Sequence, residues 1–206
     1  MAAIDTVICA VGRGESLRRA ARTAAAVLGR GGVVIFPTET VYGLAADPAK
    51  ARAIRRLQKM KGRSASKSIT LQVARVSQAL KLVKPDGRFR RCAQKFWPGP
   101  LTIVAPARSG GKIGIRIPRH RAALEILEAY GRPIAVTSAN PSGNAELWRR
   151  AELENFFKGK VDLILWERSR RRLASTVVDI GPEGVRVLRE GRISEKEIQR
   201  VASAAA

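Results

Sequence analysis

The sequence predicts an α/β domain built on a mixed sheet. Three observations indicate this fold class: helical and strand-like apolar segments alternate along the chain, 45% of its 206 residues are hydrophobic, and no repeat or long linker divides it. Alternation of this kind places helices against a sheet that holds parallel and antiparallel strands. Because this length and apolar content suit one buried core, residues 1–206 are predicted to form a single domain.

The first third of the chain predicts two helices around a short strand. Residues 17–28 carry an apolar stripe at helical spacing, formed by Leu17, Ala20, Ala21, Ala24 and Leu28. The glycine-rich segment 29–32 ends this helix. The apolar run 33–36 is typical of a buried strand, and Pro37 stops it. Residues 49–60 return to helical spacing, which predicts the second helix.

The remaining elements follow from the same two periodicities. Apolar or alternating segments predict strands, apolar stripes at three- and four-residue spacing predict helices, and Trp97 to Pro100 predicts a turn. The strands are expected at 69–73, 101–105, 113–117, 133–137, 161–166, 175–180 and 184–188, and the helices at 75–82, 86–96, 120–130, 149–157 and 194–202.

Few residues suited to metal or nucleophilic chemistry are present. One histidine, His120, and two cysteines, Cys9 and Cys92, are too few for a structural zinc site built from those ligands. His120 stands beside two arginines and is interpreted as a polar surface residue. The two cysteines give no disulfide framework, which favours a reducing cytoplasm. No run of ~18 apolar residues and no signal-peptide pattern is found, so the predicted location is cytoplasmic, without a membrane.

The charge of the chain is strongly positive. There are 39 Lys and Arg residues against 17 Asp and Glu, a formal net charge of +22, and residues 50–95 hold 15 of the basic residues with Asp86 as their single acid. This excess favours anionic partners such as nucleotides or nucleic acid. The alternative is a basic surface with no specific partner, and the charge alone does not decide between them.

Four polar segments lie at the ends of predicted strands or helices, where α/β sheets place ligands. The familiar phosphate-binding glycine motifs are missing from the sequence. The polar segments are 37–44, 61–63, 137–143 and 175–179. Each has an ordinary structural alternative, because hydroxyl and amide side chains form turns and basic residues favour helix C-termini. The functional alternative is that they converge on an anion, where arginine supplies a bidentate fork.

Taken together, these segments resemble the Sua5/YrdC/TsaC family of threonylcarbamoyl-AMP synthases. The resemblance covers about residues 15–195, the expected core of the domain. It is carried by PTETVYGL at 37–44, MKGR at 60–63, FWPGPLT at 96–102, GIRIP at 114–118, TSANPSG at 137–143 and STVVD at 175–179. The resemblance implies a twisted mixed sheet flanked by helices around a basic cavity.

The implied reaction joins L-threonine, bicarbonate and ATP into threonylcarbamoyl-adenylate and releases pyrophosphate. A separate transferase would use this adenylate to modify adenosine 37 of tRNA. The reactants are mostly anionic, so positioning and electrostatic stabilisation are expected to carry the catalysis. ATP is then a substrate, and Mg²⁺ is expected to arrive on its phosphates, with no protein metal site.

The resemblance also implies roles for individual residues. Lys61 and Arg63 correspond to the catalytic KxR element. The expected threonine-binding residues are Thr40, Gln72, Arg116, Ser138 and Ser175, and the expected ATP-binding residues are Arg63, Lys67, Lys112, Asn140 and Arg189.

Two alternatives stay open, and four departures from the family pattern support the first of them. Lys67-Ser68-Ile69 replaces an Asn-Pro-Leu, Gln72 replaces a histidine, Lys112 replaces a threonine, and Asn144 to Trp148 replace a Pro-Ser-x-Thr stretch. One alternative is a diverged paralogue that acts on a related carbamoyl or adenylate substrate. The other is a protein that binds double-stranded RNA or tRNA by shape and phosphate contacts.

Overall fold

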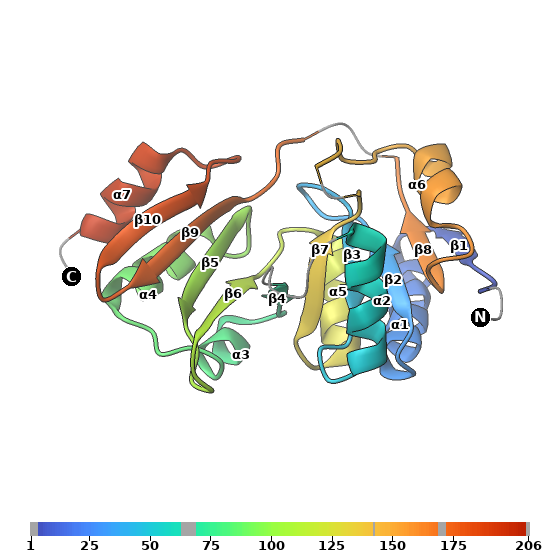
Figure 1. Ribbon diagram of the computed structural model, residues 1–206, viewed down its shortest axis with the longest axis horizontal. Helices are drawn as coiled ribbons and strands as arrows, with labels where there is room; N and C mark the ends of the chain where they lie inside the picture. The colour runs from blue at the N-terminus through green and yellow to red at the C-terminus, as the bar shows by residue number, and fades with distance from the viewer. Residues whose placement is uncertain (1–3, 63–68, 142, 169–171, 205–206) are drawn as a thin grey trace.

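The computed structural model describes residues 4–62, 69–141, 143–168 and 172–204. Within these residues ten strands form one sheet in the order β1-β8-β2-β3-β7-β4-β6-β5-β9-β10 (Figure 1). Parallel pairs such as β8 with β2 occur beside antiparallel pairs such as β3 with β7, so the predicted mixed α/β fold is confirmed. The strands are β1 (Val7–Ala10), β2 (Val33–Phe36), β3 (Gly43–Ala46), β4 (Thr70–Gln72), β5 (Leu101–Pro106), β6 (Lys112–Arg116), β7 (Ile134–Ser138), β8 (Leu163–Trp166), β9 (Thr176–Gly181) and β10 (Gly184–Arg189).

Helices cover the sheet in three groups, and each group closes one part of the core. Helices α1 and α5 pack on one face of β2, β3, β7 and β8, while α2 and α6 pack on the opposite face. Helices α4 and α7 pack against β5, β6 and β9. The helices are α1 (Gly14–Gly29), α2 (Ala51–Lys61), α3 (Val76–Leu80), α4 (Gly87–Phe96), α5 (Arg121–Tyr130), α6 (Arg150–Phe157) and α7 (Glu195–Ser203).

Strand β2 is apolar throughout because both of its faces are covered. Val34 and Phe36 pack toward α1 and α5, whereas Val33 and Ile35 pack toward α2 and α6. All four side chains are fully buried. A strand between two helical layers needs apolar residues at every position, which explains the continuous run in the sequence.

Two strands of the structure were not predicted. Gly43–Ala46 forms β3 and Val7–Ala10 forms β1, whereas the sequence patterns placed 37–44 in a loop and indicated no element before residue 17. Strand β3 contains glycine and alanine but no β-branched residue. Its pairing with β2 on one side and β7 on the other overrides that weak strand preference.

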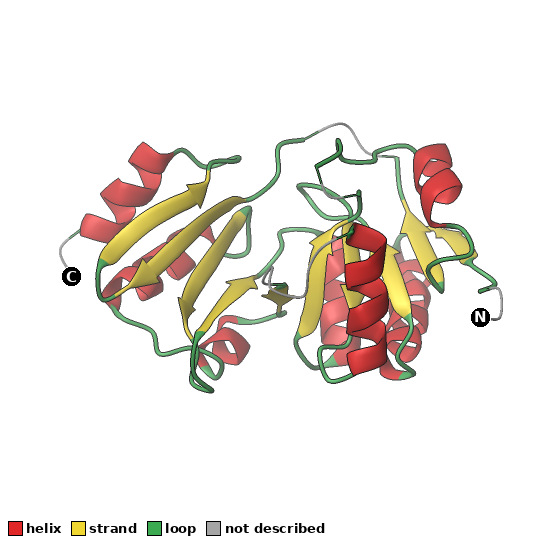
Figure 2. Cartoon of the chain, viewed as in Figure 1, coloured by secondary structure: helices red, strands yellow, loops and turns green. Residues whose placement is uncertain are grey.

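Strands β8 and β9 follow one another in the chain but stand second and ninth in the sheet order, so they lie toward opposite ends of the sheet (Figure 2). Ala174 and Ser175 directly precede β9. Among the described helices, none is long and apolar enough to cross a membrane.

Candidate active site

A cavity of about 230 Å³ lies on one face of the middle of the sheet. Its floor comes from four neighbouring strands, each of which contributes a pair of residues spaced two apart, and Thr137 of β7 also lines the cavity. Because such residues point to the same face of a strand, one side of the sheet forms the floor. These pairs are Thr70 and Gln72 on β4, Gly114 and Arg116 on β6, Thr102 and Val104 on β5, and Val136 and Ser138 on β7. The walls are lined by Thr38, the segment Val41 to Gly43, Ala174, Ser175, Val177 and Arg189.

A hydrogen-bond network joins the ends of α2 and β7. Lys61 is the last residue of α2, and only 2% of its surface is exposed. Its ammonium donates to the carbonyl oxygen of Ser138 at 2.8 Å and to both oxygens of Asn140, at 2.7 Å for the side chain. The Ser138 hydroxyl donates to the same side-chain oxygen at 2.6 Å. Ser138 lines the cavity, and the buried lysine holds the segment that carries it.

Arg116 forms a buried ion pair with Glu39. Its Nη2 atom lies 2.8 Å from Oε1 of Glu39, and its Nε donates to the carbonyl oxygen of Gly99 at 3.2 Å. The carbonyl oxygen of Glu39 accepts hydrogen bonds from Arg172 at 3.3 Å and from Arg192 at 3.1 Å. The sequence interpretation did not include Glu39 among the site residues. The sequence did hold a signal for Glu39, because it is an acidic residue that stands between two threonines in a segment directly after a buried strand.

Ser175 and Arg189 contact one another at the wall of the cavity. The Ser175 hydroxyl lies 3.1 Å from the hydroxyl of Thr102, and Nη2 of Arg189 donates to the carbonyl oxygen of Ser175 at 2.9 Å. The same guanidinium reaches the Ser175 hydroxyl at 3.2 Å. The pairing of β9 with β10 and with β5 holds these three residues together. Thr102 was not predicted as a site residue, although it ends the FWPGPLT motif.

Gln72 lines the cavity with an unused acceptor. The side chain is 4% exposed, and its Oε1 atom has no hydrogen-bond partner among the described residues. A buried acceptor left without a donor costs about 1–3 kcal/mol. The free oxygen therefore indicates a place where a ligand N–H or O–H would be stabilised.

Thr38 lines the cavity, whereas Thr40 is fully buried beside it. Their hydroxyl oxygens are 3.0 Å apart, and the Thr38 hydroxyl donates to the carbonyl oxygen of Val41 at 2.6 Å. The backbone N–H of Thr40 donates to the Thr38 hydroxyl at 3.1 Å. The two threonines thus shape the turn after β2, and Thr38 is the one that reaches the cavity wall.

Of the predicted nucleotide contacts, two fall outside the described residues and a third lies away from the cavity. Arg63 and Lys67 fall outside the described residues. Lys112 begins β6 and does not line the cavity. Its ammonium contacts both carboxylate oxygens of Asp179, at 2.7 and 2.8 Å, and half of its side chain is exposed.

The charges around the described part of the cavity are mixed. Arg116 and Arg189 line it together with one carboxylate, that of Glu146, and Glu39 balances Arg116. Glu146 belongs to the segment that departs from the family pattern. Over the described parts of the chain, no group of three or more His, Cys, Asp or Glu side chains is placed to hold a metal ion.

His120 is not the polar surface residue that the sequence indicated. Its Nε2 atom lies 2.7 Å from Oε1 of Glu167, and its side chain is largely buried. The Tyr42 hydroxyl donates to the carbonyl oxygen of Glu167 at 2.8 Å and accepts from its backbone N–H. These contacts fasten the chain beyond β8 to the segment that follows β2.

The fold and the cavity define an α/β protein that can hold a small polar ligand on the open face of a mixed sheet. The chain belongs to the Sua5, YciO and YrdC family: residues 26–191 match the model of that family, which is described as "Telomere recombination". The family resemblance predicted from the motifs is thereby confirmed.

Several relatives are named threonylcarbamoyl-AMP synthase. The protein from Pyrococcus abyssi (strain GE5 / Orsay) is 35% identical over 192 residues, which cover 87% of this chain and 56% of that protein. The protein from Thiobacillus denitrificans (strain ATCC 25259 / T1) is 35% identical over 167 residues, which cover 75% of this chain and 88% of that protein. The chain thus spans most of the second relative and little more than half of the first.

Solved structures show the same fold. The structure of P. abyssi Sua5 complexed with L-threonine matches with a TM-score of 0.85 and 31% identity, over 96% of this chain and 61% of that one. E. coli YciO matches with a TM-score of 0.84 over 95% of this chain and 99% of that one. At 22% identity, the YciO likeness supports the fold alone.

Proposed function

We propose that this chain is a threonylcarbamoyl-AMP synthase, which forms threonylcarbamoyl-adenylate and pyrophosphate from L-threonine, bicarbonate and ATP. The observation that carries the proposal is the convergence of four predicted threonine-binding residues on one cavity. Gln72, Arg116, Ser138 and Ser175 lie 103 positions apart at their extremes, and all four line the same space. The names of relatives at 35% identity support the same reaction.

The cavity offers complementary groups for a zwitterionic amino acid. The Arg116 guanidinium is the expected partner of the threonine carboxylate, which would share the arginine with Glu39 or displace it. The Ser138 and Ser175 hydroxyls can bind the threonine side chain or amine, and the free oxygen of Gln72 can accept a hydrogen bond from either. A volume of about 230 Å³ suits a ligand of amino-acid size, because pockets for drug-sized molecules span roughly 300–1,000 Å³.

The proposed chemistry has two bond-forming steps. The threonine amine attacks the carbon of bicarbonate, and loss of water leaves a carbamate. A carbamate oxygen then attacks the α-phosphorus of ATP, and pyrophosphate leaves. Neither step needs a histidine or cysteine nucleophile. Charge develops on the pyrophosphate, so fixed cations near the leaving group would stabilise the transition state.

Among the described residues, Arg189 is the proposed ATP contact that lines this cavity. Arg189 lines the wall beside Ser175, and Asn140 lies in the network of Lys61. Arg63 and Lys67 are proposed from their motif positions. Lys112 would have to leave its ion pair with Asp179 to reach a phosphate. We expect Mg²⁺ to be carried by the triphosphate, because Mg²⁺ usually keeps several waters and binds substrate phosphates.

The test is pyrophosphate release by the purified chain. We expect release only when ATP, bicarbonate and threonine are all present. No release is expected when threonine is omitted or is replaced by glycine or alanine. Heat-inactivated protein serves as the control. Release that ignores threonine would indicate a paralogue with another acceptor. No release, together with tight and salt-sensitive binding of an RNA duplex, would favour the RNA-binding alternative.

A further inference from the structure

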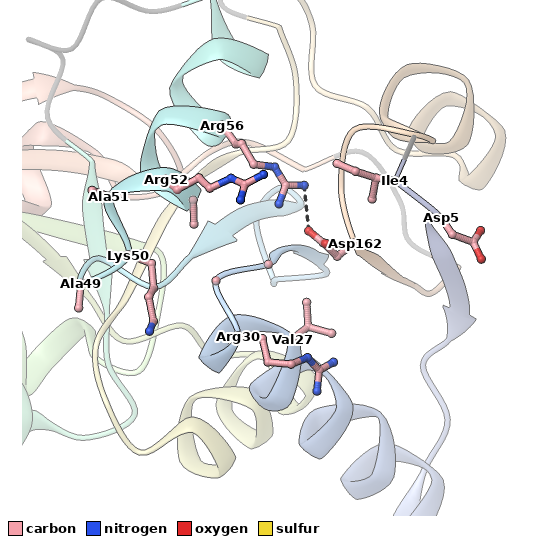
Figure 3. Close-up of a pocket in the computed structure, with 13 residues that line it drawn as sticks. Ile4, Asp5, Val27, Arg30, Ala49, Lys50, Ala51, Arg52, Arg56 and Asp162 are labelled. Atoms are coloured by element: carbon pink, nitrogen blue, oxygen red, sulfur yellow. Dashed lines mark hydrogen bonds and ion pairs between the residues drawn. The ribbon is translucent and has the colours of Figure 1, made fainter. Parts of the chain in front are cut away.

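A larger hollow of about 800 Å³ lies beside the amino ends of β2 and β8 (Figure 3). Gly31 and Gly32, directly before β2, and Asp162, directly before β8, line it. The candidate active site instead lies beyond the carboxyl end of β2, where Thr38 lines its wall. We call this second space the amino-edge hollow. Its position makes it a separate site, and nothing in the proposed reaction uses it.

Four basic side chains line the amino-edge hollow from two sides. Arg30 directly follows α1, while Lys50 directly precedes α2 and Arg52 and Arg56 lie on that helix (Figure 3). Within the described part of the chain, no carboxylate lies within ion-pair distance of Arg30, Lys50 or Arg52. These three cations are also exposed, so they are available to a ligand.

The two acids at the hollow do not cancel this charge. Asp162 is engaged twice: its Oδ2 atom accepts from Nη2 of Arg56 at 2.9 Å and from the backbone N–H of Val33 at 2.7 Å. Asp5 lies at the far side, and its carboxylate points away from the basic side chains (Figure 3). Arg56 and Asp162 therefore balance one another, and three positive charges remain on the rim.

The lining indicates which part of an anion would be recognised. Among its described residues none is aromatic, and none carries a hydroxyl or amide side chain. A nucleobase would therefore find no ring to stack on and no side chain to read its edge. Arginine and lysine side chains suit phosphate oxygens, and arginine can bind two of them at once.

We propose that the amino-edge hollow binds a compact oligophosphate, a ligand with two or more phosphate groups close together. Concavity favours a compact ligand, because the hollow falls within the volume range of small-molecule pockets, roughly 300–1,000 Å³. Cations on two sides of the space match a ligand whose charges point in several directions. The shared chemistry could be supplied by a free polyphosphate or by the phosphate chain of a nucleotide.

The first experiment titrates the ¹⁵N-labelled full chain with tripolyphosphate at physiological ionic strength. We expect saturable shifts of the amide resonances of Gly31, Gly32 and Ala51 to Ala53, which line the hollow. Monophosphate should shift them with at least roughly tenfold weaker affinity, since it can engage fewer cations at once. Shifts that do not saturate, or equal affinity for the two anions, would contradict the proposal.

A pair of matched variants locates the site. The hollow variant combines Arg30→Gln, Lys50→Gln and Arg52→Gln, and the control variant combines Arg19→Gln, Lys84→Gln and Arg90→Gln at exposed positions outside the hollow. Both lose the same charge. We expect the hollow variant to bind tripolyphosphate at least tenfold more weakly and the control variant to bind like the parent chain. Equal weakening in both variants would reveal a general charge effect and overturn the proposal.

Two further ligands distinguish the sources. ATP and tripolyphosphate should compete for the hollow with affinities within about tenfold, because the adenine has no partner there. A short RNA duplex that shifts the same resonances more strongly per phosphate, and that tripolyphosphate fails to displace, would make the hollow part of a nucleic-acid surface. That outcome would refute the compact ligand. None of these measurements depends on pyrophosphate release. The phosphate-binding proposal and the proposed function can therefore fail independently of one another.

Discussion

The pairing of Arg116 with Glu39 gives the candidate active site an internal carboxylate at the place expected for the carboxylate of threonine. Both side chains are buried, and the ion pair is 2.8 Å long. A buried arginine without an anion would be costly, since removing one partner of a buried pair costs about 3–5 kcal/mol. Glu39 therefore holds the Arg116 side chain in place while no substrate is bound.

Replacing Glu39 tests this role. In Glu39→Gln we expect the free energy of unfolding to fall by up to about 3–5 kcal/mol, because the Arg116 charge loses its partner. Threonine should restore part of that loss, so saturating threonine should raise the Tm of the variant by more than it raises that of the parent chain. Thermal unfolding with and without threonine measures both effects.

The control is Glu183→Gln, at an exposed position on the turn between β9 and β10. It should behave like the parent chain. If threonine raises the Tm of Glu39→Gln less than that of the parent chain, then Glu39 contributes to threonine binding in some other way.

The two cysteines provide a second residue-scale prediction. Cys92 on α4 is fully buried, and burial raises the pKa of its thiol to about 11, whereas Cys9 is only partly buried. Only the thiolate reacts readily, so Cys92 should be inert at pH 8. We expect N-ethylmaleimide to modify Cys9 in the native chain and both cysteines in guanidinium chloride. Peptide mapping checks this, and rapid labelling of native Cys92 would contradict the packing of α4.

At the scale of elements, the most informative difference between pattern and structure is β3. The sheet needs a strand between β2 and β7, yet the sequence there lacks β-branched residues. Gly43 explains part of this composition, because a Cβ atom at this position would lie 2.9 Å from Cγ1 of Val136 and 3.4 Å from the Phe36 ring. The glycine allows the neighbouring side chains to close over the strand.

Substitution of Gly43 should therefore destabilise the sheet. We expect Gly43→Ala to lower the free energy of unfolding by about 1–3 kcal/mol, the usual cost of overpacking a core. Gly29→Ala is the matched control, because no atom lies within 4 Å of its added Cβ and the residue ends α1. Its stability should be unchanged or slightly higher. Chemical denaturation measures both variants, and an undisturbed Gly43→Ala would mean that β3 and β7 have room to separate.

Most helices and strands were predictable because their apolar periodicity is strong. The helix predicted at 17–28 is α1, and the strand predicted at 33–36 is β2 with the same bounds. Strands β1 and β3 were missed for a physical reason. Each depends on pairing with strands distant in sequence, such as β8 for β1, and local composition does not report such pairing.

At the scale of the whole molecule, the sheet gathers the site from both halves of the chain. The sequence motifs identified Gln72, Arg116, Ser138, Ser175 and Arg189, which all line the cavity. They did not reveal that Thr38 reaches the wall while Thr40 is buried, or that Glu39 pairs with Arg116. Those distinctions depend on which way each side chain points after folding.

The distribution of the net charge of +22 over the molecule can also be described at this scale. Over the described residues, two arginines line the candidate active site beside one carboxylate, whereas four basic side chains line the amino-edge hollow and three of them have no ion-pair partner. The positive excess is thus strong at a site that the motifs did not indicate. Arg30, Lys50 and Arg52 belong to no motif, so only the folded arrangement brings them together.

The central claim is that this chain carbamoylates threonine and adenylates the product. The most direct measurement incubates it with ATP, L-threonine and ¹³C-labelled bicarbonate and identifies the nucleotide product by mass spectrometry. We predict threonylcarbamoyl-adenylate that carries the ¹³C label. An adenylate without the label, a labelled adenylate that forms without threonine, or ATP that remains unchanged would contradict the account.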